Sequence, residues 1–356
     1  MKILLNPGPV NISKRVRQAM LQEDICHREV EFSNLQTAVR DKIRTVYALD
    51  NDWTAVLLSG SGTAAMESML SSLTGKQDKL LILENGVYGA RMSRIAAIHG
   101  LDHVTQQHPW GQTIDLGLLR ENLDRGISVL AMVHHETTTG RLNDIAGIAE
   151  ICDEYKVPIL LDGVSSFGAE HIAFMDWNVM ACAATANKCL HGIPGISFVV
   201  VNRGYLQNKQ TQANTLYLDL RNYLDLQDKG GTPFTQAVQS MYALNEALDE
   251  HQDQGGWTTR QNSYNKRLKI VDDGLSELGI KPYIPLEDVS CVLHSYYLPD
   301  GHVYQSFHDS LKEAGFVIYA GQGKLSERVF RISMMGDLDE SIAHRFVESV
   351  KSILNN

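Results

Sequence analysis

An aspartate and a lysine are the side chains in this sequence best suited to chemistry. Asp162 ends the apolar run PILLD, and Lys188 comes 26 residues later, just after the apolar run VMACAATA. Short, nearly uncharged runs bounded by Gly, Pro or Asn predict buried strands. Because ligands bind at the carboxyl ends of the strands in an open parallel sheet, an acid and an amine delivered there can share one cofactor.

Pyridoxal phosphate (PLP) requires such a pair. A lysine forms a Schiff base with the aldehyde of the cofactor, and an aspartate keeps its pyridine nitrogen protonated so that the ring can accept electrons. An Asp at a strand end and a Lys in a polar loop are also common in α/β proteins without any catalytic role. The turn NKCLHGIPG favours the catalytic interpretation, because a freely solvated Lys188 would not need a backbone so rich in Gly and Pro.

A glycine-rich turn joins a predicted strand to a predicted helix in AVLLSGSGTAAMESMLSSL (55–73). Ser61, Gly62 and Thr63 fall at the start of that helix, where unpaired N–H groups and the helix dipole favour an anion. The turn is neither a Walker A loop nor a GxGxxG dinucleotide motif. Ser and Thr also cap ordinary helices, so the turn alone indicates little. Combined with Lys188, it predicts that Gly62 and Thr63 hold the PLP phosphate.

Composition excludes several other classes of protein. The chain has 356 residues, 44% of them hydrophobic, which suffices for a large core and predicts two domains. A net charge of −10 argues against a nucleic-acid partner or an anionic membrane surface. The N-terminus lacks the apolar core of a signal peptide and no run reaches membrane-spanning length, so we expect a cytoplasmic protein. Five cysteines without CxxC spacing favour reduced thiols.

Alternating strands and helices are predicted to position these residues. Strands are predicted at 79–85, from 127 within ISVLAMVHHETTTG, and at 196–202, and helices at 13–22 and 145–156. Together they predict right-handed βαβ units and an α/β fold. The stretch 205–234 predicts irregular structure. Helices 236–254 and 257–278 flank Gly255 and Gly256, where we place the boundary between a large domain (21–255, after an arm of residues 1–20) and a small α+β domain (256–356).

Four segments, NGVYGARM, HHETTTG, LLDGVSSFG and NKCLHGIPG, carry a family resemblance. They resemble the class V branch of the fold-type I PLP-dependent aminotransferases, and within it most closely the 2-aminoethylphosphonate:pyruvate aminotransferases. The resemblance spans most of the predicted large domain. It implies a large PLP-binding domain with a mostly parallel sheet and helices on both faces, together with a small C-terminal domain.

The resemblance also implies a reaction. The amino donor is 2-aminoethylphosphonate and the acceptor pyruvate, which gives phosphonoacetaldehyde and alanine. An alanine– or serine–glyoxylate (or pyruvate) aminotransferase is the alternative, because CHREVEF resembles the glyoxylate-using relatives equally well. A lyase of the cysteine desulfurase type is a weaker alternative, because its only candidate nucleophile, Cys291, lies in an apolar strand pattern that predicts an inert thiol.

The resemblance assigns further residues to the cofactor. Tyr88 is implied to stack on one face of the pyridine ring, and Val164 to cover the other. Thr139 is implied to lie near the ring and its phenolic oxygen. Ser61 and Asn187 complete the implied contacts within one chain.

The resemblance further implies an obligate homodimer. In the family, the segment TPFT crosses the interface and places a Thr on the cofactor phosphate of the neighbouring subunit. Thr235 is the candidate here, and Thr232 the second choice. A two-fold interface would give both sites the same borrowed residue.

Arg331 in VFRISMMG is the candidate for holding the substrate. It lies on a predicted strand with apolar neighbours, and a buried Arg is rare unless paired. A structural salt bridge is one interpretation. The resemblance instead implies that Arg331 binds the acidic group of the substrate, carboxylate or phosphonate.

Three N-terminal residues are further substrate candidates through the resemblance. Gly8, in the non-helical segment LNPGPVN, is implied to contact the substrate through its backbone. His27 and Arg28 belong to CHREVEF, which resembles an HR..EF signature of the family. Arg28 would supply the second cation that a dianionic phosphonate favours. No metal site is predicted, because HHE at 134–136 lacks the HExxH spacing.

Overall fold

The computed structural model describes residues 2–209 and 214–355. The chain begins with β1 (Ile3–Leu4), α1 (Lys14–Ala19) and α2 (Val30–Thr45). The following elements form the larger part of the molecule: β2 (Trp53–Ser59), α3 (Gly62–Leu73), β3 (Leu80–Glu84), α4 (Val87–Ile98), β4 (His103–Gln107), α5 (Leu116–Leu123), β5 (Val129–Val133), β6 (His135–Glu136), β7 (Arg141–Leu142), α6 (Ile145–Glu154), β8 (Ile159–Asp162), β9 (Val179–Thr185), β10 (Ile196–Asn202), α7 (Arg203–Asn208), α8 (Leu220–Gln227) and α9 (Val238–Asp253).

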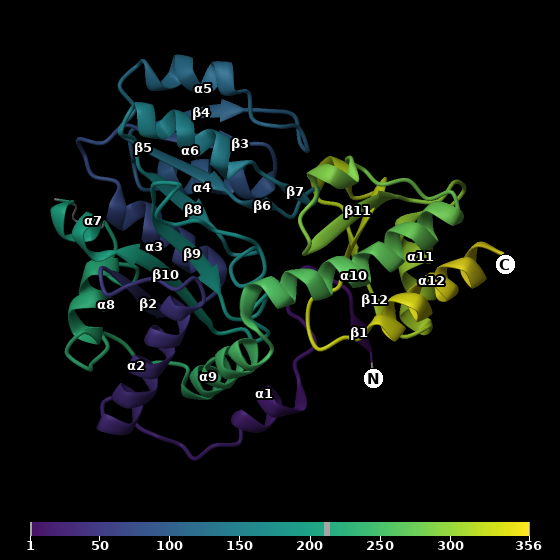
Figure 1. Cartoon of the computed structure of the whole chain (residues 1–356), viewed down its shortest axis with the longest axis horizontal. Coiled ribbons are helices and arrows are strands. Elements are labelled where there is room, and N and C mark those ends of the chain that lie inside the picture. The colour runs from purple at the N-terminus through teal and green to yellow at the C-terminus, as the bar shows by residue number, and fades with distance from the viewer. Residues whose placement is uncertain (1, 210–213, 356) are drawn as a thin grey trace.

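The C-terminal part begins with a 22-residue helix that runs from the middle of the molecule towards its right-hand side in Figure 1. Its elements are α10 (Gly256–Glu277), η1 (Leu286–Asp288), β11 (Leu293–Tyr297), α11 (Tyr304–Glu313), β12 (Phe316–Val317), β13 (Tyr319–Ala320), η2 (Gly323–Leu325), β14 (Val329–Ser333) and α12 (Glu340–Leu354). None of the helices in the described part of the chain combines the length and apolarity needed to cross a membrane.

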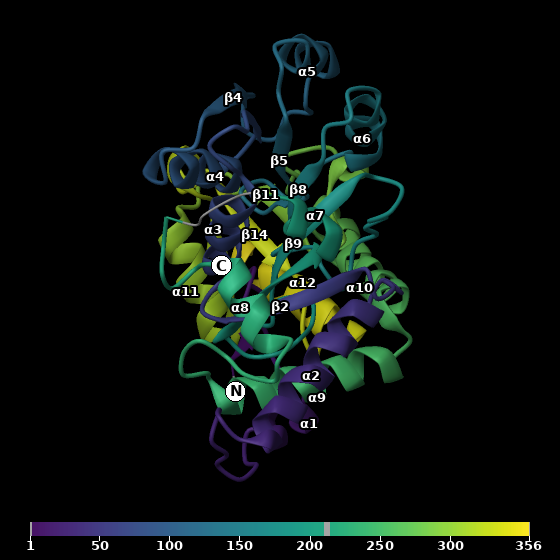
Figure 2. The same cartoon turned by 90° about the vertical axis from the view of Figure 1, so that its left-hand side faces the viewer.

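A seven-stranded sheet forms the centre of the larger part, in the order β2-β10-β9-β8-β5-β3-β4. The five strands from β9 to β4 are mutually parallel, and β10 runs antiparallel to both of its neighbours. The protein is therefore an α/β protein with a mixed, mostly parallel sheet, as the sequence predicted. Figure 2 shows the same sheet turned by 90°, with helices on either side.

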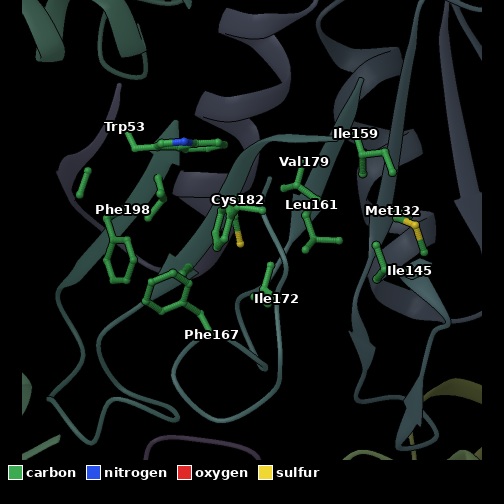
Figure 3. Close-up of a cluster of buried hydrophobic side chains, with 14 of the residues drawn as sticks. Trp53, Met132, Ile145, Ile159, Leu161, Phe167, Ile172, Val179, Cys182 and Phe198 are labelled. Carbon is green, nitrogen blue, oxygen red and sulfur yellow. The ribbon is translucent and has the colours of Figure 1, made fainter. Parts of the chain in front are cut away.

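Each face of the sheet has its own apolar layer, because successive side chains of a strand point to opposite faces. On β2, for example, Ala55 and Leu57 face one cluster, and Val56 and Leu58 face the other. The first cluster is closed by α2, α5, α6 and α9, and Figure 3 shows its centre. The second is closed by α3, α4, α7 and α8. Burial on both faces explains why the strands are continuous apolar runs.

The C-terminal part has a separate apolar cluster beneath a three-stranded sheet in the order β11-β14-β13. The N-terminal arm joins this part, because β1 pairs in parallel with β12 and Leu5 is fully buried in the same cluster. The division into a large domain (21–255) and a small domain (256–356) stays a prediction. Its boundary coincides with the start of α10 at Gly256.

The stretch 205–234 is not wholly irregular, which corrects the sequence-based expectation. Helix α8 lies within it, and Asp219 caps this helix by accepting hydrogen bonds from the N–H groups of Arg221 and Asn222. Its buried positions Leu220, Tyr223, Leu224 and Gln227 follow the helical spacing, but the intervening polar residues obscured that pattern.

Candidate active site

Asp162 and Lys188 meet at one edge of the sheet. Asp162 is the last residue of β8, which pairs in parallel with β9, and Lys188 lies in the turn directly after β9. The turn is closed by hydrogen bonds from the N–H of His191 to the carbonyl of Lys188 and from Gly192 to Ala186. His191 adopts a left-handed backbone, with φ of 62°. The turn therefore holds Lys188 in one position, with 9% of the residue exposed.

The Asp162 carboxylate is buried and only half satisfied. Its Oδ1 accepts a hydrogen bond from the N–H of Val164 at 2.9 Å, and its Oδ2 has no donor within residues 2–209 and 214–355. Burial raises the pKa of Asp162, and the positive charges of Lys188 and Arg91 oppose that shift. A protonated ring nitrogen is the kind of donor that would satisfy the free oxygen and its charge.

Tyr88 lies beside the lysine. Its ring centroid is 5.7 Å from Nζ of Lys188 and 4.6 Å from Cζ of Arg91. Burial raises the pKa of the Tyr88 phenol, the charges of Lys188, Arg91 and Arg331 and the neighbouring Thr137 lower it, and the net effect is a lowered pKa. Tyr88 is thus an aromatic surface in a strongly positive environment.

Glu136 fixes the first turn of α4, which carries Tyr88. Its buried carboxylate accepts hydrogen bonds from the N–H groups of Tyr88 and Gly89 at 3.1 and 3.2 Å, and from the Thr138 hydroxyl at 2.6 Å. A Cβ atom at Gly86 would lie 2.2 Å from Cδ of Glu136, so only glycine lets the carboxylate approach. The acid of the HHE segment is therefore used to orient Tyr88, a role that its sequence pattern did not indicate.

The glycine-rich turn forms the start of α3. Ser61 is the N-cap and makes no side-chain capping bond, so the first N–H groups of the helix are not capped by it. A Cβ atom on Gly62 would lie 2.6 Å from Cγ1 of Val164. The turn therefore packs closely against the segment after Asp162. The Thr63 hydroxyl accepts a hydrogen bond from Nη1 of Arg91 at 3.1 Å. These groups suit a phosphate dianion.

Arg91 is a site residue that the sequence analysis missed. It lies three positions after Tyr88 on α4, so the two side chains share one face of the helix. The segment NGVYGARM contained the clue, a cation one helical turn from the aromatic residue. Arg91 adds a positive charge between Tyr88 and the helix start that carries Thr63.

Arg331 is 4% exposed and has no salt bridge with the described residues. Its Nε donates to the carbonyl of Ala320 at 2.8 Å and its Nη1 to that of Thr137 at 2.9 Å. Burial lowers the pKa of Arg331, but a guanidinium keeps its charge in a protein. Its Nη2 group has no acceptor in the described chain and is not fully enclosed. The structural salt bridge considered above is therefore absent from the described part of the chain, and the charge of Arg331 has no carboxylate bound to it there.

Gly8 brings the N-terminal arm against the lysine. A Cβ atom at Gly8 would lie 3.0 Å from Cγ of Lys188, and Gly8 has a φ of 107°, which favours glycine. Pairing of β1 with β12 anchors the arm on one side of this contact. The arm therefore covers the stem of Lys188.

The side chains of Thr139 and Asn187 form no hydrogen bond to Asp162 or Lys188 among the described residues. Thr139 is fully buried, and its methyl group faces the position of Gly111 at 3.5 Å. Thr137, two residues before Thr139, contacts the site through its carbonyl, which accepts a hydrogen bond from Arg331. The side-chain oxygen of Asn187 accepts a hydrogen bond from the hydroxyl of Thr185 at 2.8 Å.

Four predicted residues lie on the surface or away from this centre within one chain. Thr235 is exposed, and Thr232 is buried with its hydroxyl directed at the carbonyl of Phe234. Arg28 is exposed just before α2, and His27 is half-buried with Nε2 unpaired among the described residues. None of the four forms a hydrogen bond or salt bridge to Lys188, Asp162 or Arg331 in the described part of the chain.

The donor set fits PLP. The Nζ of Lys188, the Oδ2 of Asp162 and the Nη2 of Arg331 have no partner within the described residues, and none of the three is fully enclosed. The buried Nε2 of His135 is also unpaired there, and it feels the charge of Lys188. An amine for an aldehyde, an acid for a pyridine nitrogen, an aromatic ring and an anion seat are linked by the contacts and charge interactions of Lys188, Asp162, Tyr88 and Arg91. The fold and these groups define a fold-type I PLP-dependent transferase.

The comparisons with known proteins agree with this definition. The model of the class V aminotransferase family matches residues 11–298. The chain belongs to the class V aminotransferases, and it is an aminotransferase with PLP as its cofactor.

Two curated relatives are similar over almost the whole chain, and both are 2-aminoethylphosphonate–pyruvate transaminases. The protein of Bacillus cereus (strain AH820) is 33% identical over 356 residues, which cover 98% of this chain and 96% of the relative. That of Lysinibacillus sphaericus (strain C3-41) is 33% identical over 358 residues, which cover 99% and 97%.

Solved structures share the fold. Alanine–glyoxylate aminotransferase from Nostoc sp. has a TM-score of 0.92 and 27% identity, covering 99% of this chain and 95% of its own. Ureidoglycine–glyoxylate aminotransferase from Bacillus subtilis has a TM-score of 0.92 and 22% identity, covering 100% and 93%, and this likeness shows the fold alone.

Proposed function

We propose that the protein transfers the amino group of 2-aminoethylphosphonate to pyruvate, giving phosphonoacetaldehyde and alanine. The observation that carries this proposal is Arg331, a buried cation that, among the described residues, binds two backbone carbonyls and has no acceptor for Nη2. A buried cation without an anion is costly, so the site gains stability from an acidic group on the substrate. The similarity to curated transaminases of this specificity supports a phosphonate as that group.

Each of the site residues has a separate role in this reaction. Bound PLP supplies an aldehyde and an electron-accepting ring. Lys188 would hold the aldehyde, and its amine would move a proton at the donor carbon that bears the nitrogen. Asp162 accepts the hydrogen bond of the ring nitrogen and holds its proton. The arm around Gly8 and the Tyr88 ring keep water from the lysine.

We also propose that the active form is a homodimer in which Thr235 completes the phosphate seat of the partner. Thr235 is exposed, and the next residue, Gln236, contacts the hydroxyl of Ser59 just before the glycine-rich turn. Leu216 and Tyr217 nearby are 78% and 41% exposed, and such apolar exposure favours association. The hydroxyl of Tyr217 donates to the carbonyl of Ser59, which joins this surface to the same turn.

An alanine– or serine–glyoxylate aminotransferase is the second candidate. A dianionic phosphonate favours two cations, and Arg28, the expected second one, is exposed and does not contact Arg331 within one chain. A monocarboxylate needs only the fork of Arg331. A desulfurase is disfavoured, because Cys291 is 5% exposed and burial raises the pKa of its thiol well above the ordinary value.

A panel of amino donors at single turnover tests the proposal. The PLP-loaded enzyme is mixed with 2-aminoethylphosphonate, alanine, serine or taurine, and conversion of the cofactor is followed by absorbance. The phosphonate should react fastest, and pyruvate should then restore the starting spectrum faster than glyoxylate. Rapid conversion by serine without a response to the phosphonate would transfer the assignment to the second candidate.

A further inference from the structure

A second cavity, of about 670 Å³, lies behind the Lys188 turn. Helix α10, the end of α9 and the loop before α12 enclose it. Arg260 and Arg267 lie at its base and are 4% and 6% exposed, and the carboxylates of Asp337, Asp339 and Glu340 stand on its exposed rim. The cavity thus combines buried positive groups with an acidic entrance.

The two arginines share one face of α10, because seven residues correspond to about two helical turns. Arg260 donates to the carbonyl of Cys189 at 2.6 Å and to the side chain of Gln254 at 2.8 Å. Arg267 donates through Nε to the carbonyl of Ser263 at 3.0 Å, and through Nη1 to that of Leu338 at 2.8 Å. Neither forms a salt bridge with the described residues.

Part of each guanidinium remains free. In the described part of the chain, the Nη2 of Arg267 and the Nε of Arg260 have no acceptor, and neither atom is fully enclosed. The hydrogen bonds to backbone carbonyls can be explained by a structural role, in which the arginines hold neighbouring segments together. That role does not use the remaining N–H groups. Two buried cations that share a cavity repel each other, and this repulsion adds to the burial that lowers the pKa of Arg267.

The other charged or titratable groups that line the cavity are either neutral, bound elsewhere or at the rim. The Nε2 of His191 accepts a hydrogen bond from the N–H of Gly336 and lies 2.5 Å from the hydroxyl oxygen of Tyr264, and burial lowers the pKa of His191, so it is neutral. Glu250 is a buried carboxylate that accepts a hydrogen bond from the hydroxyl of Ser13, and its charge offsets part of the positive charge of Arg260. Lys266 is exposed, and Asp339 caps α12 through the N–H of Ile342.

We propose that this cavity binds a small zwitterion of the amino acid class, with its acidic group on Arg260 and Arg267 and its ammonium group towards the carboxylates of the rim. A simple anion would meet the free N–H groups but would be repelled by the three rim acids. A simple cation would leave the buried arginines unpaired. A zwitterion satisfies both, because each of its charges meets the opposite charge.

The cavity borders two segments that carry or adjoin active-site residues, the turn that contains Lys188 and the segment after β14. Arg260 binds the carbonyl of Cys189, the residue after Lys188. Gly336 follows β14, the strand that carries Arg331, and it donates to His191 in the Lys188 turn. The cavity is therefore a separate site that rests on the same two segments as the lysine and Arg331.

The proposal is tested by calorimetric titration of the PLP-loaded enzyme with N,N-dimethylglycine. This zwitterion has a tertiary nitrogen, so it cannot form an imine with the cofactor. Its carbon analogue 3-methylbutanoate carries only the acid, and trimethylamine only the cation. N,N-dimethylglycine should bind saturably and at least about tenfold (~1.4 kcal/mol) more tightly than either analogue.

Two variants locate the binding. Arg267→Met should weaken N,N-dimethylglycine at least about tenfold. Asp337→Asn, an exposed change on the rim, should weaken the zwitterion about threefold or more and leave 3-methylbutanoate unchanged. Arg331→Met, which removes the cation of the active site and leaves both arginines of the second cavity in place, should leave binding as in the wild type.

Three results would overturn the proposal. The first is that N,N-dimethylglycine does not bind the wild type saturably. The second is that Asp337→Asn leaves the affinity for N,N-dimethylglycine unchanged. The third is that Arg331→Met abolishes binding, which would assign the ligand to the active site. If Arg267→Met does not fold, as judged by circular dichroism, Asp337→Asn decides alone.

Discussion

Replacing Arg331 by methionine should separate substrate recognition from the chemistry of the cofactor. The side chain is 4% exposed, and its Nη2 has no acceptor among the described residues. A hydrogen bond to a charged group contributes about 1.5–3 kcal/mol, so a two-pronged contact with a substrate acid contributes roughly 3–5 kcal/mol. Arg331→Met should therefore lower kcat/KM for 2-aminoethylphosphonate roughly 10²- to 10⁴-fold.

The assay compares two amines that differ only in the acidic group. Single-turnover conversion of the cofactor is measured with 2-aminoethylphosphonate and with ethylamine, which lacks the phosphonate. Arg331→Met should slow the first reaction and leave the slow reaction of ethylamine within about threefold of the wild type. Arg331→Lys keeps the charge but loses the planar fork, so it should recover part of the loss.

Equal losses for both amines would refute the assignment. Arg331 also binds the carbonyls of Ala320 and Thr137, which join β13 to the loop after β6. Loss of those bonds alone would disturb the site for every donor alike. Circular dichroism and thermal unfolding of the variant establish whether the fold persists.

Three further predictions concern the cofactor. Lys188→Ala should abolish turnover and remove the yellow colour of covalently held PLP while reversible binding persists; a normal rate would disprove the role. Asp162→Asn should lower kcat by on the order of 10²-fold, yet stabilise the cofactor-free protein near neutral pH. Burial raises the pKa of Asp162 above its ordinary value of 3.8, so the ionised carboxylate destabilises the cofactor-free wild type above about pH 3.8. The difference in unfolding temperature between Asp162→Asn and the wild type should therefore disappear as the pH falls towards 3.8. Thr235→Ala should weaken PLP retention by an intact dimer, whereas Thr232→Ala should not; an active wild-type monomer in sedimentation would contradict the shared site.

The positions of Asp162 and Lys188 could be predicted from the sequence because they depend on local signals. Apolar strands before Asp162 and Lys188, and the glycines around Thr63, place these residues at strand ends and at a helix start. These features follow from short-range periodicity and turn chemistry. The structure brings them together as expected, and the family comparison confirms the cofactor and the class of reaction.

Contacts between distant segments could not be predicted in this way. The bond between Arg91 and Thr63 spans 28 residues, and the bond between Arg331 and Thr137 spans 194. The sequence could not show whether Arg331 had a carboxylate partner, because that depends on which acids the fold brings near it. It also assigned Glu136 no role, although this acid orients Tyr88.

The sequence by itself thus determined the α/β class, the order of the elements and the Asp162–Lys188 pair, because these follow from patterns within a few residues. Only the tertiary structure decided which polar groups stay unpaired. The Nη2 of Arg331 and part of each guanidinium group in the second cavity have no hydrogen-bond acceptor among the described residues, because the groups that fold against them accept from only some of their N–H groups. Pairing is a property of the whole packing arrangement, and local periodicity carries no information about it.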